Sequence, residues 1–314
     1  MKTVDVILPV YNEEESIARF HATLLETIGA LSSRYQFKIL YILDRSHDRS
    51  FTILKDLARS CPQMTVLHLS RRFGHQMSLV AGLDRSKGDA VIMMDCDLQH
   101  PPAVIPRLLE KFEDGYDVVH TIRKYDQQIG LLKRRTSGIF YRFQNALSPV
   151  DIREGAADFR LISSRVALLF QTSMREQNQF LRGLFQWVGF RSTSVTFISP
   201  PRAAGKTKYD FFRLITFSIS GITSFSKVPL RFATLAGFGI SMLSLLYALW
   251  LLVEYFLAGH YPAGYASLIL VVLFIGGLQL VVLGILGEYL GSVFDEVKNR
   301  PLYIIDEIVE GGHV

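Results

Sequence analysis

Residues 93–102 read MMDCDLQHPP, and the apolar run that leads into them begins at Ala90. A short apolar run of this kind predicts a strand that is buried on both faces. Two carboxylates, Asp95 and Asp97, follow it at once. Like charges this close repel unless a cation lies between them. The stretch therefore indicates a divalent-cation site at a strand end, unless Asp95 is a solvated terminus and Asp97 caps a helix that the two prolines begin.

Apolar strand-like runs alternate with amphipathic helix-like runs on both sides of this stretch. Strands are expected at residues 4–10, 37–43, 65–70, 89–95 and 116–122, and helices at residues 13–31, 48–60, 75–86 and 102–115. The alternation predicts an α/β domain whose mostly parallel sheet is covered by helices on both faces. Ligands bind such sheets beyond the carboxyl ends of the strands. Asn12 and Glu13 follow the first strand and Asp44 follows the second, so they are expected to share one crevice with the carboxylate pair.

The apolar excess of the chain lies after Pro229. The chain has 314 residues, of which 49% are hydrophobic, and its formal net charge is +5. Residues 232–253 and 266–287 carry no charged side chain. Each run is long enough to cross a hydrocarbon core of ~30 Å. Because both runs are apolar on all faces, they favour two transmembrane helices over a pair of buried core helices.

The charges that flank these runs predict an orientation. No Lys or Arg lies between the two apolar runs. The basic residues on the two outer flanks are Arg213, Lys227 and Arg231 before the first run, and Lys298 and Arg300 after the second. The positive-inside rule places both flanks in the cytosol. Residues 209–227 mix apolar side chains with Ser, Thr, Arg and Lys, so we expect one or two interfacial helices there, the alternative being a stripe that packs on the α/β domain. The N-terminal apolar run is too short for a signal peptide.

The last residues and the two cysteines complete the expected organisation. Residues 303–310, YIIDEIVE, alternate like a strand and are expected to pair with a sheet edge, of this chain or of a neighbouring copy, which leaves a homo-oligomer open. Cys61 and Cys96 form no CxxC or His/Cys cluster, so neither a disulfide framework nor a zinc site is supported. We expect four segments: an α/β domain at 1–208, interfacial helices at 209–228, a transmembrane hairpin at 229–292 and a cytosolic tail at 293–314.

A series of motifs in this order resembles the polyprenyl-phosphate glycosyltransferases of glycosyltransferase family 2. The motifs are VILPVYNEEESI (6–17), DCDLQHPP (95–102), ADFRLISSR (157–165), FLRGLFQWVGF (180–190), AGKTKYDFFRL (204–214) and GITSFSKVPLR (221–231). The chain is most similar to bactoprenol glucosyltransferases and less so to dolichyl-phosphate mannose synthase. The resemblance implies a GT-A fold and inverting transfer of a hexose, with glucose the favoured sugar, from a UDP-sugar to undecaprenyl phosphate at the cytosolic face of the inner membrane. No nucleic-acid partner is expected.

The resemblance also implies a role for particular residues. Mg²⁺ or Mn²⁺ on the donor diphosphate would be held by Asp95, Asp97 and Gln99. The nucleotide pocket would be lined by Pro9, Tyr11, Glu13 and Asp44. Phosphate groups would be bound by Arg182, Arg202, Lys206 and Lys208. Asp158 and Asp97 would be the catalytic residues, with Asp158 orienting the acceptor. Two simpler explanations stay open: a structural salt bridge from Asp158 to Arg160, and basic residues that serve the membrane topology alone.

The chain departs from the family pattern after its second strand. Where the family usually has VDDGS, this chain has ILDRS, so Leu43 replaces an aspartate that commonly contacts the base and Arg45 replaces a glycine. Arg45 either meets a phosphate or is a surface residue. Arg72 replaces a common asparagine. His47, His75 and His100 either line the rim of the site or lie on the surface.

Two other functions compete with this assignment. A processive polysaccharide synthase shares the fold, but its Q-x-x-R-W motif is incomplete here, because Gly183 follows Gln179-Phe-Leu-Arg182. A membrane-anchored nucleotide-sugar-binding protein without turnover would explain the altered second-strand motif. The retained acidic residues Asp95, Asp97 and Asp158 argue against it.

Overall fold

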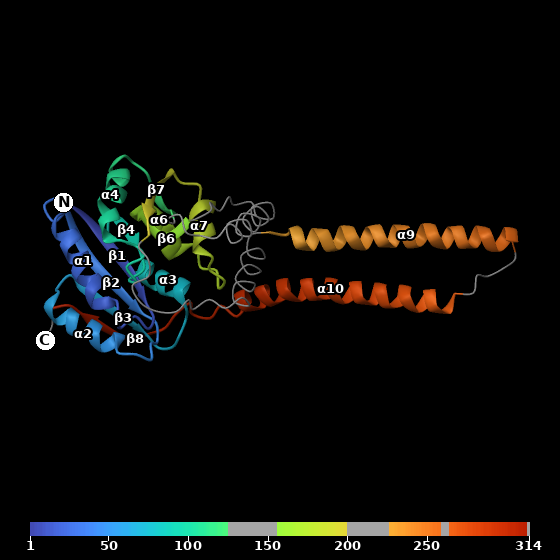
Figure 1. Ribbon diagram of the computed structural model, residues 1–314, viewed down its shortest axis with the longest axis horizontal. Coiled ribbons are helices and arrows are strands. Elements are labelled where there is room, and N and C mark those ends of the chain that lie inside the picture. The colour runs from blue at the N-terminus through green and yellow to red at the C-terminus, as the bar shows by residue number, and fades with distance from the viewer. Residues whose placement is uncertain (125–155, 200–225, 259–263, 313–314) are drawn as a thin grey trace. The chain divides into compact units, whose positions relative to one another are not determined.

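The computed structural model describes residues 1–124, 156–199, 226–258 and 264–312 (Figure 1). The described residues form two compact units. The first contains the residues up to 199 together with those from Arg300 onward, and the second contains residues 226–299. The interfacial helices expected at 209–228 fall almost wholly outside the described residues, so they stay a prediction.

The first unit is built on one sheet whose described strands lie in the order β7-β5-β6-β4-β1-β2-β3-β8. The strands are β1 (Lys2–Val10), β2 (Tyr35–Leu43), β3 (Met64–Leu69), β4 (Ala90–Met93), β5 (Val118–Lys124), β6 (Ala156–Ser163), β7 (Ser192–Ile198) and β8 (Ile305–Glu310). The helices are α1 (Ile17–Gly29), α2 (Ser50–Ser60), α3 (His75–Arg85), η1 (Pro102–Val104), α4 (Ile105–Glu113), α6 (Ser164–Thr172) and α7 (Leu181–Trp187). The strands and helices expected up to residue 122 are confirmed, with ends that differ by a few residues.

The sheet is mixed, with a parallel centre. β1 pairs in parallel with β2 and β4, and β2 pairs in parallel with β3. β6 lies antiparallel between β4 and β5, while β5 and β7 are parallel. Because β1, β2, β3 and β4 run the same way, the loops after them meet at one edge of the sheet. The carboxylate pair lies in the loop after β4.

Helices cover both faces of the sheet. Alternate residues of a strand point to opposite faces, and on β1 the residues Val4, Val6 and Leu8 join a core cluster with side chains of α1, α2 and α4. On the other face Ile7 lies against Gly82 of α3. This double cover explains why β1 is buried without interruption from Val4 to Val10.

The predicted tail strand belongs to this sheet. β8 pairs antiparallel with β3, from Thr65 opposite Glu310 to Leu69 opposite Ile305. The residues just before it are also attached, because the N–H of Ser70 donates to the carbonyl of Ile304 (3.0 Å). In the described chain the strand therefore completes an edge of its own sheet, and residues 300–312 are part of the α/β unit rather than a separate tail.

The second unit consists of two long helices, α9 (Val228–Ala258) and α10 (Tyr265–Val297), which contact each other. The segments Leu230–Tyr247 and Phe274–Val297 are long and apolar enough to cross a membrane, and only 6% and 0% of them is buried. Large apolar side chains such as Phe238, Leu246 and Leu280 are mostly exposed. The helices therefore lack the burial of core helices. Tyr289 of α10 donates to the carbonyl of Ser226 (2.6 Å), which ties the start of α9 to α10.

Gly82 lets α3 lie directly on β1, and α3 positions the loop before it at the site. A Cβ atom at Gly82 would overlap Cγ2 of Ile7. Alanine favours a helix over glycine by ~1 kcal/mol, but overpacking a core contact costs roughly 1–3 kcal/mol. We therefore expect Gly82→Ala to lower the thermal unfolding midpoint of the detergent-solubilised protein by several degrees.

Two further variants give this measurement its controls. Gly29 ends α1 and a Cβ there meets nothing within 4 Å, so Gly29→Ala is expected to be neutral or stabilising. In an Ile7→Ala background the obstructing methyl is gone, and Gly82→Ala is expected to cost far less than in the wild type. An equal loss in both backgrounds would show that the contact with Ile7 is not the cause.

Candidate active site

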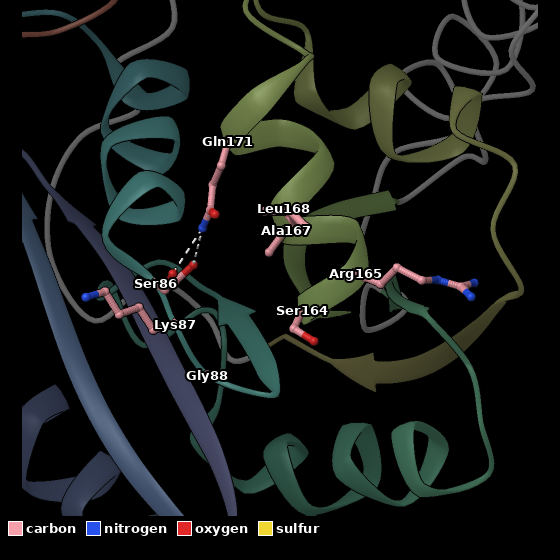
Figure 2. Close-up of a pocket in the computed structure, with 8 residues that line it drawn as sticks. All are labelled: Ser86, Lys87, Gly88, Ser164, Arg165, Ala167, Leu168 and Gln171. Atoms are coloured by element: carbon pink, nitrogen blue, oxygen red, sulfur yellow. Dashed lines mark hydrogen bonds between the residues drawn. The ribbon is translucent and has the colours of Figure 1, made fainter.

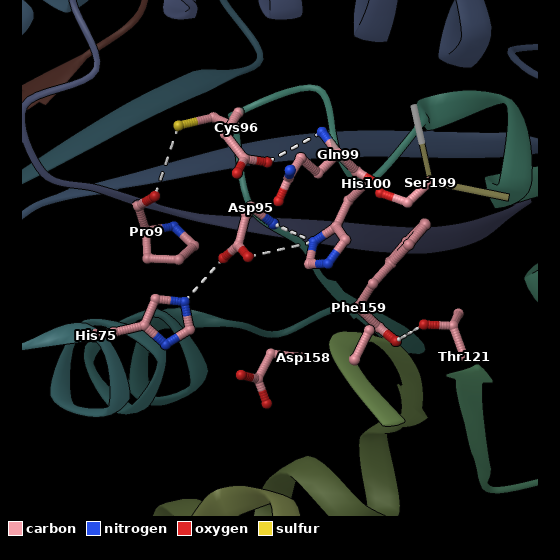
Figure 3. A network of polar contacts seen from close by, with 12 residues as sticks. Pro9, His75, Asp95, Cys96, Gln99, His100, Thr121, Asp158, Phe159 and Ser199 are labelled. Atoms are coloured by element: carbon pink, nitrogen blue, oxygen red, sulfur yellow. Dashed lines mark hydrogen bonds and ion pairs between the residues drawn. The ribbon is translucent and has the colours of Figure 1, made fainter. Parts of the chain in front are cut away.

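The loop that follows β4 carries the carboxylate pair and is anchored by a buried histidine (Figure 3). The N–H of Asp95 donates to Nδ1 of His100 (2.9 Å). His100 is 1% exposed and packs against the rings of Phe159 and Phe197. The interpretation of His100 as a surface residue is therefore wrong. Its ring fixes the point at which the chain leaves the strand and begins the loop.

Asp97 shapes the same loop from within. Its Oδ1 accepts the N–H of Gln99 (3.0 Å), and the Ser199 hydroxyl donates to the Gln99 carbonyl (3.1 Å). Leu98 between them has a φ of 64°, a left-handed conformation that a leucine adopts only where its surroundings enforce it. The helical turn η1, which begins at the second proline, Pro102, has no side-chain cap. The alternative that Asp97 caps this helix is therefore wrong.

Asp95 is held by a second histidine, at the start of α3. His75 Nε2 lies 2.8 Å from Asp95 Oδ1. Burial alone would raise the pKa of Asp95, but the attraction of His100 and His75 outweighs burial and holds this pKa at about 2. Burial lowers the pKa of His75, but Asp95 and, more weakly, Asp158 raise it to about 9. At neutral pH the pair is therefore an anionic carboxylate and a cationic imidazole.

Asp158 of β6 lies between two guanidinium groups. Arg160 donates to its Oδ1 and Arg182 of α7 donates to its Oδ2, each at 2.9 Å. Burial raises the pKa of Asp158, but the two arginines outweigh it and hold this pKa well below its usual range. Arg160 is 2% exposed, and its guanidinium lies 4.8 Å from the Phe185 ring centroid. Burial lowers the pKa of Arg160 to about 10, so it stays charged at neutral pH. The salt bridge to Arg160 thus exists, together with one to Arg182.

Asp44, at the end of β2, is used within the fold. It is 3% exposed. Its two carboxylate oxygens accept the backbone N–H groups of Phe73 and Gly74, each at 2.8 Å. Gly74 has a φ of 94°, which favours glycine at this position. Asp44 thus fixes the loop between β3 and α3, and its predicted place in the nucleotide pocket stays a prediction.

The loops after β1 and β2 are cross-linked beside it. The N–H of Asn12 donates to the Ser46 hydroxyl (3.0 Å), and Asn12 Oδ1 accepts the N–H of His47 (2.9 Å). The N–H of Glu13 donates to the Ser50 hydroxyl (3.0 Å). These bonds hold the segment that carries Pro9, Tyr11 and Glu13 at the carboxyl edge of the sheet. The Cys96 thiol lies 3.6 Å from the carbonyl of Pro9, which brings this segment beside the carboxylate pair.

The two residues that depart from the family pattern, Leu43 and Arg45, both make structural contacts within the fold. Leu43 is fully buried and belongs to the core cluster that includes Val10 and Tyr41. Arg45 donates to the carbonyl of Ser70 (2.9 Å), so its guanidinium braces the loop after β3. Arg45 therefore has a structural contact that neither of the two sequence-based alternatives included.

The carboxylate pair suits a hard divalent cation by its donor chemistry. Mg²⁺ and Mn²⁺ prefer carboxylate and amide oxygens, and Asp95, Asp97 and Gln99 supply these from one loop. Among the described residues no group of three or more His, Cys, Asp or Glu side chains could hold a metal by itself. Oxygens from a substrate diphosphate and from water would therefore have to complete the coordination. Asp95 is ionised, as a metal ligand must be.

Three residues that the sequence offered only as alternatives belong to the site, and other predicted residues stay untested. His75, His100 and Arg160 take part in the site through the contacts given above. In the sequence, two of them lie close to predicted site residues. His100 directly follows Gln99 of the carboxylate motif, and Arg160 is two residues from Asp158. The predicted phosphate-binding residues Arg202, Lys206 and Lys208 lie outside the described residues.

A separate hollow of about 320 Å³ lies around the loop that enters β4, away from this site (Figure 2). Ser86, Lys87, Gly88, Ser164, Arg165, Ala167, Leu168 and Gln171 line it. The side chains of Lys87 and Arg165 point away from each other (Figure 2). Arg165 is paired with Asp117 (2.9 Å). The two charged side chains that line the hollow therefore do not converge, and no carboxylate lines it, unlike the carboxyl edge.

The sequence was compared with known proteins. Residues 5–168 match Glycosyl transferase family 2. The chain is 40% identical to an SfII prophage-derived bactoprenol glucosyl transferase of Shigella flexneri, over 98% of this chain and 99% of that one. It is 39% identical to a prophage bactoprenol glucosyl transferase homolog of Escherichia coli, over 97% and 99% of the two chains. It is also 39% identical to an uncharacterized glycosyltransferase of Synechocystis sp., over 97% and 95%. The similarity thus includes the long apolar helices.

The charge balance around Asp158 predicts an unequal effect of two substitutions. Asp158→Asn leaves two guanidinium groups facing each other in a buried site, whereas Arg160→Met leaves the Asp158–Arg182 pair intact. Leaving a buried charge unpaired costs roughly 3–5 kcal/mol. We expect Asp158→Asn to lower the thermal unfolding midpoint of the detergent-solubilised protein much more than Arg160→Met does.

The double variant Asp158→Asn/Arg160→Met tests the cause. It removes one charge of each sign, so its midpoint should lie above that of Asp158→Asn alone. If the double variant is instead the least stable of the three, repulsion between the guanidinium groups does not explain the loss.

Proposed function

We propose that this chain, which belongs to glycosyl transferase family 2, transfers glucose from a UDP-sugar to a polyprenyl phosphate at a membrane surface. The observation that carries the proposal is the 40% identity with a bactoprenol glucosyl transferase over nearly the whole of both chains. The site described above supplies the groups that such a reaction needs. The fold of the first unit is that of a GT-A glycosyltransferase, with the carboxylate pair at the expected edge of the sheet.

The donor side of the reaction is assigned to the loop after β4. Asp95, Asp97 and Gln99 would hold Mg²⁺ or Mn²⁺ against the donor diphosphate. The cation would stabilise the charge that develops on the leaving nucleoside diphosphate. Pro9, Tyr11 and Glu13 would line the nucleotide pocket beside this loop. Asp44 would contribute to this pocket by holding the loop between β3 and α3.

The acceptor side needs no strong general base. A lipid phosphate is already ionised near neutral pH, so its oxygen can attack the anomeric carbon while the bond to the diphosphate breaks. Asp158 is a weak base here, because two arginines hold it as an anion with a low pKa. We assign it to positioning Arg182, whose guanidinium would meet the acceptor phosphate. Direct displacement inverts the anomeric configuration.

The apolar helices fit an acceptor whose phosphate lies at the bilayer surface. We propose that α9 and α10 cross the inner membrane as a hairpin, with the α/β unit and both termini in the cytosol. Residues 209–228 would lie in the interface, and Arg202, Lys206 and Lys208 would help to hold the lipid phosphate. Arg is well suited to this task because its planar fork binds two phosphate oxygens at once.

The reaction is tested with detergent-purified protein, undecaprenyl phosphate and a panel of radiolabelled UDP-sugars. We expect a labelled lipid from UDP-glucose in the presence of Mn²⁺ or Mg²⁺. Removal of the metal with EDTA should abolish the product, and re-addition should restore it. Asp97→Asn should reduce the rate by roughly 10²-fold or more, since it removes one of two metal carboxylates. Label from another sugar would change the donor assigned here. Binding of UDP-sugars without turnover would favour the alternative of a membrane-anchored nucleotide-sugar-binding protein.

The stereochemistry of the product is tested separately. Because the proposed step is a single displacement, an α-linked donor should give a β-linked lipid sugar. The coupling constant of the anomeric proton in an NMR spectrum distinguishes the two forms. An α-linked product would exclude direct displacement by the lipid phosphate.

A further inference from the structure

The loop between β3 and α3 places a guanidinium on a residue of the proposed nucleotide pocket. The Cζ atom of Arg72 lies 4.1 Å from the ring centroid of Tyr11. Arg72 is exposed, so a ligand at this edge of the sheet can reach it. The contact joins the loops after β1 and β3, which border the carboxylate-bearing loop on the same side of the sheet.

The position of Arg72 is fixed by the loop around it. Asp44 holds the N–H groups of Phe73 and Gly74. Arg45 donates to the carbonyl of Ser70 (2.9 Å), whose N–H in turn donates to the carbonyl of Ile304 (3.0 Å). Hydrogen bonds therefore anchor the backbone on both sides of Arg72: at Ser70 before it, and at Phe73 and Gly74 after it. A group that is held before the ligand arrives loses little freedom on binding.

The neighbouring strand end offers no carboxylate that is free of such a structural contact. Leu43 is an apolar core residue, and both oxygens of Asp44 accept backbone N–H groups. A base that enters beside Tyr11 therefore meets the guanidinium of Arg72 on the side of the loop between β3 and α3. A guanidinium has five N–H donors and no acceptor. It is complementary to ring carbonyl oxygens, of which uracil has two and adenine has none.

We propose that Arg72 is a specificity-determining residue that donates to a carbonyl oxygen of the uracil base, with Tyr11 holding the plane of its guanidinium. The inference rests on the proposed function, because it takes the donor to be a UDP-sugar. In the family pattern an aspartate after the second strand would select the base. The inference assigns this selectivity to Arg72, which lies on a different loop. Arg72 is therefore expected to matter for the choice of nucleotide and not for the transfer step.

The test compares the binding of UDP and ADP in the presence of Mg²⁺ to the detergent-solubilised full chain by calorimetry. In Arg72→Asn the dissociation constant of UDP should rise roughly tenfold, because a charged hydrogen-bond donor is lost. That of ADP should change by about twofold or less, as for an ordinary surface substitution. Arg72→Lys keeps the charge but loses the planar fork, so it should resemble Arg72→Asn in its UDP-to-ADP ratio.

Arg71 provides the matched control. It carries the same charge on the same loop, but its guanidinium lies 4.1 Å from the ring of Phe73 and donates to the carbonyl of Arg72 (3.3 Å). Arg71→Asn should leave the UDP-to-ADP ratio unchanged. Unfolding midpoints of all variants show whether each is folded at the temperature of the titration.

Five outcomes decide the question. A loss of UDP affinity without a loss of ADP affinity supports the inference. An equal loss for both nucleotides would assign Arg72 to the diphosphate and overturn base recognition, as would no change for either. If the wild type itself binds no UDP, the donor assigned under the proposed function fails, and base recognition fails with it. Transfer from UDP-glucose by an Arg72→Asn variant with unchanged UDP affinity would overturn this inference alone.

Discussion

A carboxylate that is withdrawn from water is costly unless opposite charges or hydrogen bonds compensate it. At the carboxyl edge of this sheet, one buried carboxylate and two half-buried ones are compensated in three different ways. Asp44 is compensated by backbone N–H groups. Asp158 is compensated by two guanidinium groups. Asp95 is compensated by the cationic imidazole of His75. Each of these partners comes from another segment of the chain, so the carboxylates also fix how those segments meet.

The kind of partner determines what each carboxylate can still do. Backbone N–H groups belong to the loop itself, so Asp44 cannot release them without loss of the loop conformation. The arginines of Asp158 keep it anionic, which suits a positioning role and weakens it as a base. The imidazole of His75 is 39% exposed and lies on Asp95 from one side. Asp95 is therefore the carboxylate whose present partner could most easily give way to a cation, and it is the one at the start of the predicted metal motif.

The sequence predicted those parts of the fold and site that depend on local pattern. Apolar runs and amphipathic repeats identified the strands and helices up to residue 122, and the polar residues at strand ends identified the carboxyl edge. Long-range pairing was not predictable in the same way: the antiparallel insertion of β6 between β4 and β5 has no local signature. The burial of His100 depends on Phe159 and Phe197, which are distant in sequence. From the sequence, Leu43 and Arg45 were only departures from a family motif. Their structural contacts were not predictable, because the contacting residues lie on other strands and loops.

The end of the chain shows how such distant contacts bear on the site. The segment after α10 is bound to the α/β unit at several points: Tyr303 donates to Asp84 of α3 (2.8 Å), and Gln177 donates to the carbonyl of Arg300 (2.5 Å). Ile304 then accepts from Ser70, at the base of the loop that carries Arg72. That loop is therefore held both by the residues that follow β2 and by the residue that precedes β8. A change near residue 304 is therefore expected to alter the proposed donor side of the site without touching any residue proposed to bind a ligand, because the loop of Arg72 is attached to the sheet edge that β8 completes.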